Sequence, residues 1–271
     1  MIRDITIGQY YPADSPVHKL DPRVKLFATL IYIIALFTFK GILGFGIITL
    51  FMVGVIKCSK VPFSYIVKGL KAIVMILMIT AVFNLLLTPG NTTFWQWGVF
   101  QISDTGIRNA ILMSLRLIYL IIGTSLMTLT TTPNQLTDGL EKSLGPLNKI
   151  HVPVHAIAMM MSIALRFIPI LIEETDKIMK AQMARGANFE KGNIIEKAKN
   201  MVPILVPLFV SAFRRADDLA MAMEARCYNG GEGRTKMEPL TYSANDGKAY
   251  VIILTFIALV ILARIFLPFP M

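Results

Sequence analysis

The stretch "VHAIAMMMSIALRFIPILI", Val154–Ile172, decides the fold, because its position relative to a membrane fixes how often the chain crosses it. The run is 19 residues long and largely apolar, close to the roughly 20 residues that a spanning helix needs. It also contains His155 and Arg166, and an arginine at the centre of a span costs about 2.5–3.5 kcal/mol on insertion. The run alone therefore fits either a span or a helix at the membrane surface.

The residues that follow this run favour the surface helix. If Val154–Ile172 crossed the membrane, "MVPILVPLFVSAF", Met201–Phe213, would have to cross back. The basic residues near and between the two runs would then lie outside, against the tendency of Lys and Arg to stay inside. These residues are Lys177, Lys180, Arg185, Lys191, Lys197 and Lys199. We therefore predict two long amphipathic helices on or partly in the inner leaflet, with a seven-span chain as the alternative.

The composition of the chain is that of an integral membrane protein. Of its 271 residues, 55% are hydrophobic and only 16% are charged, whereas soluble domains have about 45–50% and about 25%. The net charge of +10 is spread between apolar segments, which membrane topology explains without a nucleic-acid partner. The first residues lack a secretory signal pattern, so the first span itself is expected to direct insertion.

Five apolar runs are predicted to cross the bilayer. They are Val24–Phe39, Ile42–Ile56, Ala72–Leu87, Ile107–Thr130 and Ala249–Leu267. Counting the first two runs separately puts the basic residues of the first 25 positions on the same side as those between Lys57 and Lys71. The loop Pro89–Gly106 has no Lys or Arg, and the stretch Thr131–Lys248 has 15. The first is expected outside and the second inside.

This topology predicts the domain organisation of an all-α membrane protein with its N-terminus in the cytoplasm and its C-terminus outside. Residues 1–130 and 248–271 form a transmembrane helical domain. Residues 131–247 form a cytoplasmic or interfacial domain with two long helices.

Proline and glycine mark three helices in the second domain. Thr132 and Pro133 predict a cap followed by Pro at the first helical position, and Gly145-Pro146 predicts a stop. A second helix is expected from Pro153 to about Arg185. A third is expected from near Pro203 and Pro207 to at least Glu224, with an apolar stripe. The stripe consists of Leu205, Leu208 and Phe209, Ala212, Leu219 and Met223. Arg214 and Arg215 are spaced for local ion pairs with Asp217 and Asp218.

Two similar triplets end the two long helices and are the candidate functional residues. The first is Ala184-Arg185-Gly186 and the second is Ala225-Arg226-Cys227. Arginine in a last helical turn complements the helix dipole, and glycine is a common residue just past the end. This ordinary explanation suits the first triplet. In the second, Cys227 replaces the capping glycine and Gly230-Gly231 is a better stop, so Arg226 is expected inside a continuing turn.

Catalytic and metal-binding patterns are missing from the sequence. It has no phosphate-binding loop, no HExxH and no GxSxG, and its three histidines lack zinc-site spacing. Cys58 and Cys227 have no nearby metal-binding residues. Glu173-Glu174 fits a charged helix face better than a pair of catalytic acids. Arg116 lies inside a predicted span, and an ionisable residue there is a candidate functional residue. We expect no catalytic residue, no metal and no cofactor, with a membrane hydrolase or a passive scaffold as rival classes.

The sequence resembles the transmembrane T component of energy-coupling factor transporters, which are bacterial ATP-binding-cassette importers of vitamins and metal ions. The resemblance covers nearly the whole chain. It rests on "HKLDPRVKL", "TTPNQLTDGLEKSLGPL", "MMMSIALRFIPILIEE", "AQMARGANF" and "RRADDLAMAMEARCYNGG". Family members carry two Ala-Arg-Gly motifs at the ends of coupling helices, and this chain departs from them only at Cys227.

The resemblance implies a non-enzymatic coupling subunit in the cell membrane. Arg185 and Arg226, with their neighbours Ala184, Gly186, Ala225 and Cys227, would dock with two ATPase subunits. Other surfaces would hold a substrate-binding S component in the bilayer. Arginine suits such a joint because its guanidinium makes forked hydrogen bonds. Methionines on the two long helices could form an adaptable apolar platform for a partner that tilts.

Overall fold

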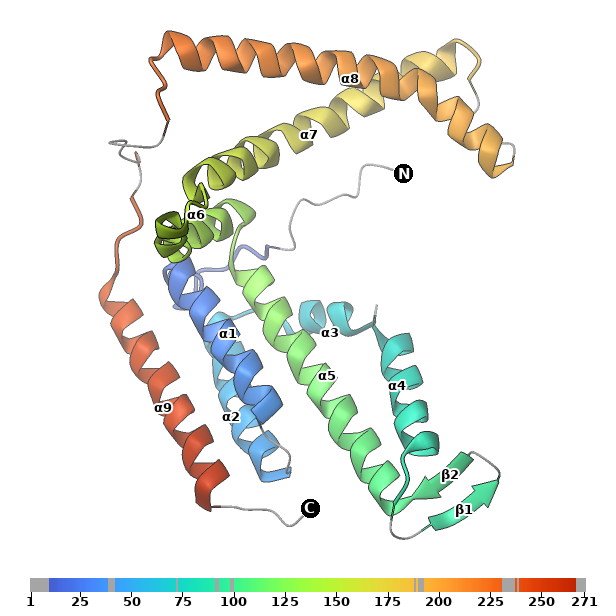
Figure 1. The fold of residues 1–271 in the computed structure, drawn as a ribbon, viewed down its shortest axis with the longest axis vertical. Helices are drawn as coiled ribbons and strands as arrows, with labels where there is room; N and C mark the ends of the chain where they lie inside the picture. The colour runs from blue at the N-terminus through green and yellow to red at the C-terminus, as the bar shows by residue number, and fades with distance from the viewer. Residues whose placement is uncertain are drawn as a thin grey trace. The chain divides into compact units, whose positions relative to one another are not determined.

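A computed structural model describes residues 10–38, 42–71, 73–90, 93–97, 100–187, 189, 193–230, 237 and 239–266. These described residues form helices and one β-hairpin, joined by turns and loops (Figure 1). The helices are α1 (Pro22–Thr38), α2 (Ile42–Ser59), α3 (Phe63–Lys71), α4 (Val74–Leu87), α5 (Asp104–Thr130), α6 (Pro133–Ser143), the 3-10 helix η1 (Gly145–Ile150), α7 (Val154–Ala184), α8 (Ile194–Ala225) and α9 (Ala244–Phe266). The strands are β1 (Thr93–Trp97) and β2 (Phe100–Ser103).

The chain forms two compact units. One comprises Gly8–Leu140 with Leu240–Met271, and the other contains Glu141–Pro239. The first unit holds α1–α5, most of α6, the hairpin and α9, and the second holds η1, α7 and α8. The helices predicted from Thr132-Pro133 and from Pro153 are confirmed at α6 and α7. Thr132 and Gln135 cap α6 reciprocally, each side chain accepting the other's backbone N–H.

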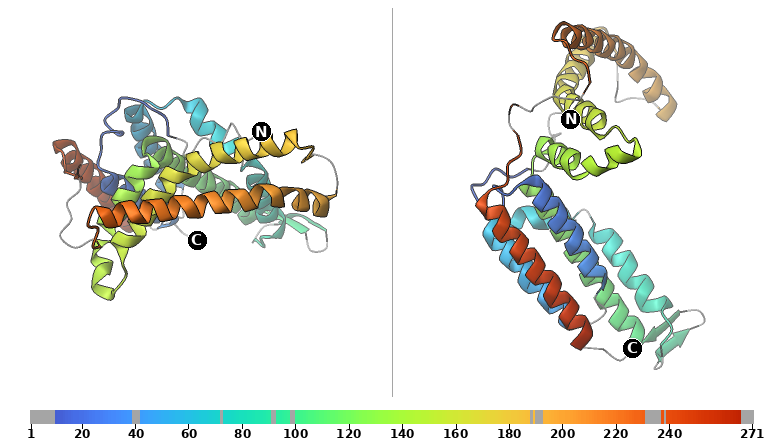
Figure 2. Two further views of the ribbon diagram at one scale, coloured as in Figure 1. Left: turned by 90° about the horizontal axis from the view of Figure 1, so that it is seen from above. Right: turned by 60° about the vertical axis from the view of Figure 1, so that its left-hand side comes forward.

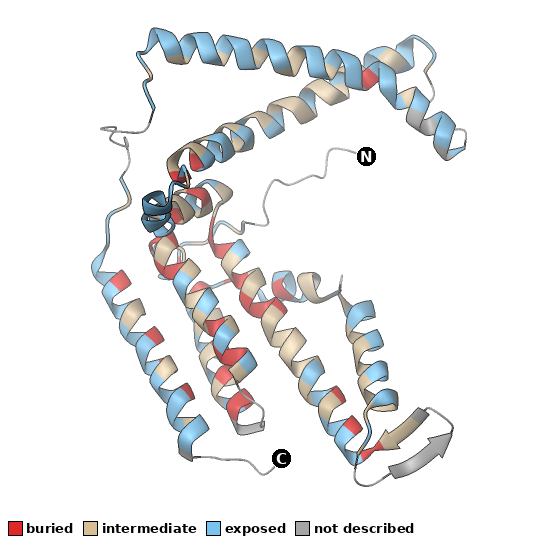
Figure 3. Cartoon of the chain, viewed as in Figure 1, coloured by how far each residue is buried: buried red, intermediate tan, exposed pale blue. Residues whose placement is uncertain are grey.

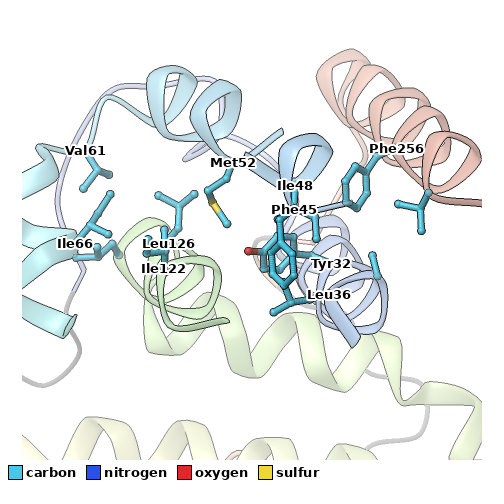
Figure 4. Packing of buried hydrophobic residues seen from close by; sticks show 13 residues of the cluster. Tyr32, Leu36, Phe45, Ile48, Met52, Val61, Ile66, Ile122, Leu126 and Phe256 are labelled. Carbon is cyan, nitrogen blue, oxygen red and sulfur yellow. The ribbon is translucent and has the colours of Figure 1, made fainter. Parts of the chain in front are cut away.

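The core of the first unit lies where α1, α2, α3, α5 and α9 meet. Tyr32, Leu36, Ile48, Leu126 and Phe256 are buried there (Figure 4). The same helices also carry many exposed apolar side chains, and exposed residues are pale blue in Figure 3. Apolar side chains directed both inward and outward are the pattern of helices that lipid surrounds.

A buried carboxylate joins the beginnings of α1 and α9. Asp246 is 2% exposed, and its Oδ1 accepts the backbone N–H of Asp21 at 2.8 Å. Its Oδ2 accepts the Ser243 N–H at 2.6 Å and the Ser243 hydroxyl at 2.8 Å. Arg23 donates to Asp21 Oδ2 at 2.7 Å and lies over the Tyr242 ring, with Cζ 4.0 Å from its centroid. Segments more than 200 residues apart are thereby fixed at one end of the bundle.

A second polar junction joins the N-terminal segment to α1 and α5. The Lys25 ammonium donates to the carbonyl of Thr130 at 2.8 Å and to that of His18 at 3.0 Å. The His18 ring contacts the Ser15 hydroxyl and the Tyr11 carbonyl through its two nitrogens, and burial lowers the pKa of His18. Lys25 and His18 therefore tie the start of α1 to the end of α5 and to the N-terminal segment.

Each of the five predicted spans overlaps a helix, with Phe39, Ala72 and Leu267 outside the described residues, but the number of spans stays a prediction. Within the described residues, three helices are long and apolar enough to cross a membrane, namely α5, α7 and α9. The pair α3 and α4 meets the same test as one bent span. Helix α7, which contains Val154–Ile172, meets this test, whereas α8, which would supply the return span of a seven-span chain, is not among the described helices that do.

The hairpin between α4 and α5 was not predicted. Strands β1 and β2 pair antiparallel, with Gln96 opposite Gln101 and Trp97 opposite Phe100. The aromatic residues of this loop, which are favoured in strands, were the available signal. The Ser103 side chain ends the hairpin and starts α5 by accepting the Gly106 N–H at 3.0 Å.

Candidate functional site

The candidate site is built on α7 and α8, which form an antiparallel pair (Figure 1; Figure 2, left). The two helices are cross-linked where Glu174 on α7 faces Ser211 and Arg215 on α8. The Ser211 hydroxyl donates to Glu174 Oε1 at 2.5 Å, and Arg215 Nη2 donates to Glu174 Oε2 at 2.9 Å. We call these three residues the crossing cluster.

The crossing cluster corrects one expectation and supports another. Arg215 pairs with Glu174 on the other helix, and none of the described ion pairs joins Arg214 or Arg215 to Asp217 or Asp218. Glu174 is therefore a structural contact between helices. Glu173 beside it is exposed, which agrees with the predicted charged helix face.

Apolar packing continues from the crossing cluster toward the N-terminal part of α7. Ile163, Phe167 and Leu171 from α7 lie along a shallow crevice of about 290 Å³. The α8 wall of the crevice includes Ala212, Leu219 and Met223. These three belong to the predicted apolar stripe of α8, so that part of the stripe packs against α7.

The part of the stripe nearer the start of α8 does not line this crevice and is more exposed. Leu205 and Phe209 are 44% and 61% exposed. Exposed apolar residues continue along α8 at Val206, Val210 and Phe213, and on α7 at Met160 and Met161. The predicted stripe therefore lines the crevice against α7 only in its C-terminal part, while its N-terminal part and the exposed residues beside it form an apolar surface of α8.

Helix α8 begins earlier than the sequence predicted. It starts at Ile194 and contains both Pro203 and Pro207 in its interior. Proline lacks an N–H, so Pro207 cannot bond the carbonyl four residues before it, which is that of Pro203. The Gln182 side chain of α7 donates to this carbonyl at 3.3 Å. A side chain from the neighbouring helix thereby satisfies the group that the proline leaves free.

Helix α7 ends directly before Arg185. Its last residue is Ala184, Arg185 is the C-cap, and Gly186 follows with a left-handed φ of +91°. The Gly186 N–H donates to Met183 O and the Ala187 N–H to Gln182 O, both at 3.0 Å. These two bonds define a Schellman cap, which needs a left-handed residue at the position of Gly186.

Helix α8 ends in the same way, which corrects the expectation of a continuing turn. Its last residue is Ala225, so Arg226 occupies the place that Arg185 has on α7. The Cys227 N–H donates to Glu224 O at 2.8 Å and the Tyr228 N–H to Met223 O at 3.0 Å. Cys227 has a φ of +54°, a conformation uncommon outside glycine. The cap geometry therefore persists although glycine is replaced.

The two arginines are presented at opposite ends of the helix pair. Arg185 and Arg226 are both exposed. Arg185 lies 11 residues after Glu174, and Arg226 lies 11 residues after Arg215. At a rise of 1.5 Å per residue, each arginine is about 16 Å along its helix from the crossing cluster, in opposite directions. The structure does not bring the two triplets together, and they form two separate surfaces.

The other singled-out residues lie elsewhere. Arg116 is on α5, and its guanidinium lies 5.5 Å from the centroid of the Phe37 ring. Cys58 and Cys227 are free and exposed. Within the part of the chain that the structure describes, no three His, Cys, Asp or Glu side chains are grouped to hold a metal ion.

Known proteins match this chain over nearly its whole length. The CbiQ family, described as cobalt transport protein, matches residues 13–237. Three relatives are each named energy-coupling factor transporter transmembrane protein EcfT. The one from Clostridium kluyveri is 58% identical over 98% of both chains. The one from Ruminiclostridium cellulolyticum is 52% identical over 97% of this chain and 98% of its own. The one from Bacillus subtilis is 47% identical over 97% of this chain and all of its own.

The extent of these matches agrees with the architecture. They cover the apolar helices of the first unit as well as α7 and α8, with the cap of each long helix. Identities of 47–58% over almost complete chains are far above what a shared fold alone would give. The chain therefore belongs to the CbiQ family, as a member of its energy-coupling factor transporter transmembrane proteins.

Proposed function

We propose that the chain is the coupling subunit of an ATP-driven importer of vitamins or other micronutrients. It would pass the motion of two ATPase subunits, through α7 and α8, to a substrate-binding S component in the bilayer. The observation that carries this proposal is the repeated cap, which presents Arg185 and Arg226 in one local geometry at opposite ends of one helix pair. Two arginines held in the same cap geometry suit binding to two equivalent partner subunits.

The helix pair has the properties that transmission of motion needs. The crossing cluster fixes α7 to α8 at one point, and the apolar crevice residues extend the contact. A displacement of either arginine is therefore carried along a stiff helix to the crossing. A guanidinium can hold carboxylate or carbonyl oxygens of a partner through two parallel hydrogen bonds, which anchors a joint that moves.

The unpartnered apolar face of α8 is proposed to receive the S component. Val206, Phe209, Val210 and Phe213 are each more than half exposed. A continuous apolar face of this kind marks a surface that contacts a protein or the membrane. Methionines on the neighbouring helix, Met160 and Met161, can repack against a partner that changes its tilt.

The proposal places residues 131–247, including both arginines, in the cytoplasm with five spans in the bilayer. The placement follows from the 15 basic residues between Thr131 and Lys248. It keeps both arginines on the side where ATP is available, and leaves α7 and α8 lying at the inner membrane surface.

Cysteine labelling tests this topology at a single position. In a background with Cys58→Ser and Cys227→Ser, Asn193→Cys between α7 and α8 is expected to resist an impermeant thiol reagent in intact cells. It should react after permeabilisation. Asp104→Cys, at the start of α5, should react from outside in both cases. Labelling of Asn193→Cys from outside would establish the seven-span chain.

Purification from native membranes tests the proposed function directly. The chain has no phosphate-binding loop, so ATP hydrolysis is expected only in fractions that retain partner ATPases. We expect the tagged chain to co-purify with ATPase subunits and a small hydrophobic membrane protein. Catalysis by the isolated chain would favour a membrane hydrolase. Purification of the chain without ATPases, from cells that import the substrate, would favour a passive scaffold.

A further inference from the structure

An apolar groove of about 680 Å³ opens on the surface of the first unit. Its walls are α2 and α9, and its floor is made by α1 and α5. The wall residues Leu50 and Ile252 are 78% and 57% exposed, so the groove is open toward the membrane. It is separate from the triplets and from the crossing cluster, all of which belong to the other unit.

The groove has the length of one membrane leaflet. On α2 its lining extends from Ile47 to Cys58, and on α9 from Lys248 to Leu259. Each wall therefore spans 11 residue steps, or about 16 Å at 1.5 Å per residue. Half of a bilayer's hydrocarbon core is about 15 Å. An acyl chain that starts at one membrane surface would fill the groove and end near the bilayer centre.

The lining changes from apolar to basic along this length. Lys25, Asn245 and Lys248 lie at the end where α1 and α9 begin, and no other lining residue that the structure describes is charged. This end also carries the basic residues of the segment before α1, so it faces the membrane surface where positive charge is concentrated.

The described charged side chains at this end leave one net positive charge, with Arg23, Lys25 and Lys248 opposed by Asp21 and Asp246. Asp246 already accepts three hydrogen bonds, and Asp21 is paired with Arg23. Lys25 donates to two neutral carbonyls and interacts electrostatically with Asp21 and Asp246, so these two carboxylates offset Arg23 and Lys25 and not Lys248. Lys248 is exposed and forms no ion pair with any side chain that the structure describes. An anionic group of a ligand would complement the positive charge at this end of the groove.

We propose that this groove binds one acidic phospholipid, with an acyl chain between α2 and α9 and its phosphate headgroup at Lys248. The leaflet length supports a lipid chain, and the single basic end supports an anionic headgroup. The proposal does not depend on the coupling role, because it needs only that the first unit is embedded in a membrane.

Gly54 gives a means to close the groove without disturbing the protein. It lies on the α2 wall, and a Cβ added there meets no atom within 4 Å. Gly46 is on the same helix and is equally open, but it does not line the groove. Gly54→Phe should therefore occupy the groove, and Gly46→Phe is its matched control. Ile252→Trp closes the groove from the α9 wall as a second, independent variant.

The test is native mass spectrometry of the purified full chain in detergent. The probes are phosphatidylglycerol and phosphatidylcholine with identical acyl chains, added in equal amounts. The unmodified chain and Gly46→Phe should retain one phosphatidylglycerol in preference to phosphatidylcholine. Gly54→Phe and Ile252→Trp should lose this retained lipid. Lys248→Gln should keep a bound lipid but lower the preference about fivefold, whereas Arg264→Gln at the other end of α9 should not.

Three outcomes would overturn the proposal. Equal lipid retention by the unmodified chain and by both groove-filling variants would show that the lipid binds elsewhere. Equal retention of the two phospholipids by the unmodified chain would remove the role of Lys248. In the assembled complex, a photoreactive reagent on Cys58, with Cys227→Ser, should label lipid. Cross-linking to a membrane protein would assign the groove to that partner instead.

Discussion

Replacing both Arg185 and Arg226 by alanine is expected to release the ATPase subunits from the complex and to abolish uptake. Truncation of a buried, hydrogen-bonded interface charge typically costs about 2–5 kcal/mol. The lower value already weakens each contact by about 30-fold, since 1.4 kcal/mol is a factor of ten. Each single variant should keep a partly held complex with strongly reduced transport. Co-purified ATPase and substrate uptake are measured together.

Two matched controls separate the anchoring role from helix capping. Arg214→Ala removes an exposed arginine from the same helix outside the triplet and should leave uptake unchanged. Cys227→Gly keeps Arg226 but relieves the left-handed cysteine, so it should retain the ATPases and stabilise the cap by up to about 1 kcal/mol.

The competing explanation makes a clearly different prediction. If the arginines only complemented the helix dipoles, each substitution would cost about 0.3–1 kcal/mol of helix stability. Uptake would then stay near normal. A double variant that retains both ATPases and imports substrate would refute the anchoring role.

Gly123→Ala is expected to destabilise the first unit although it adds only a methyl group. A Cβ at this position would lie 2.3 Å from Cε1 of Tyr32, much closer than two carbons can approach. The ring cannot easily move away, because Tyr32 is buried and its hydroxyl donates to the Tyr119 carbonyl at 2.8 Å. Overpacking of this kind costs about 1–3 kcal/mol, and Gly123→Val should cost more. The loss is measured as a lower Tm of the purified chain in detergent.

Helix propensity alone predicts the opposite sign. Alanine is favoured over glycine within a helix, so Gly46→Ala on α2, where no atom lies within 4 Å of the added Cβ, should be neutral or slightly stabilising. Adding Tyr32→Ala to Gly123→Ala should destabilise less than the sum of the two single changes, because the clash is then absent. Equal Tm values for Gly123→Ala and Gly46→Ala would show that α1 and α5 are not packed as described.

Several features could be predicted from the sequence because they depend only on residues close together along the chain. Apolar runs of nearly spanning length predicted the membrane class, and Thr132-Pro133 and Pro153 predicted the starts of α6 and α7. The candidate site was found because "AQMARGANF" and "AMEARCYNG" repeat a pattern that can be seen within the chain itself. The similarity to a known family was likewise present in local motifs.

The errors share a physical cause, which is that local signals do not report distant partners. Pro203 and Pro207 predicted the start of a helix, but Gln182 satisfies the carbonyl that Pro207 leaves free. Arg215 has acidic neighbours at helical spacing, yet it pairs with a carboxylate 41 positions away. Local propensity is a weak prior that such tertiary contacts override.

The sequence by itself determined that the chain is a helical membrane protein of this family, with Arg185 and Arg226 as its candidate functional residues. Hydrophobicity and the repeated triplets suffice for that, since both act over short stretches. Only the tertiary structure decided that Cys227 adopts the backbone of a capping glycine and that the crossing cluster lies midway between the arginines. It also decided that Gly123 must lack a side chain. These features depend on which atoms of distant segments meet, and that is fixed only when the helices pack.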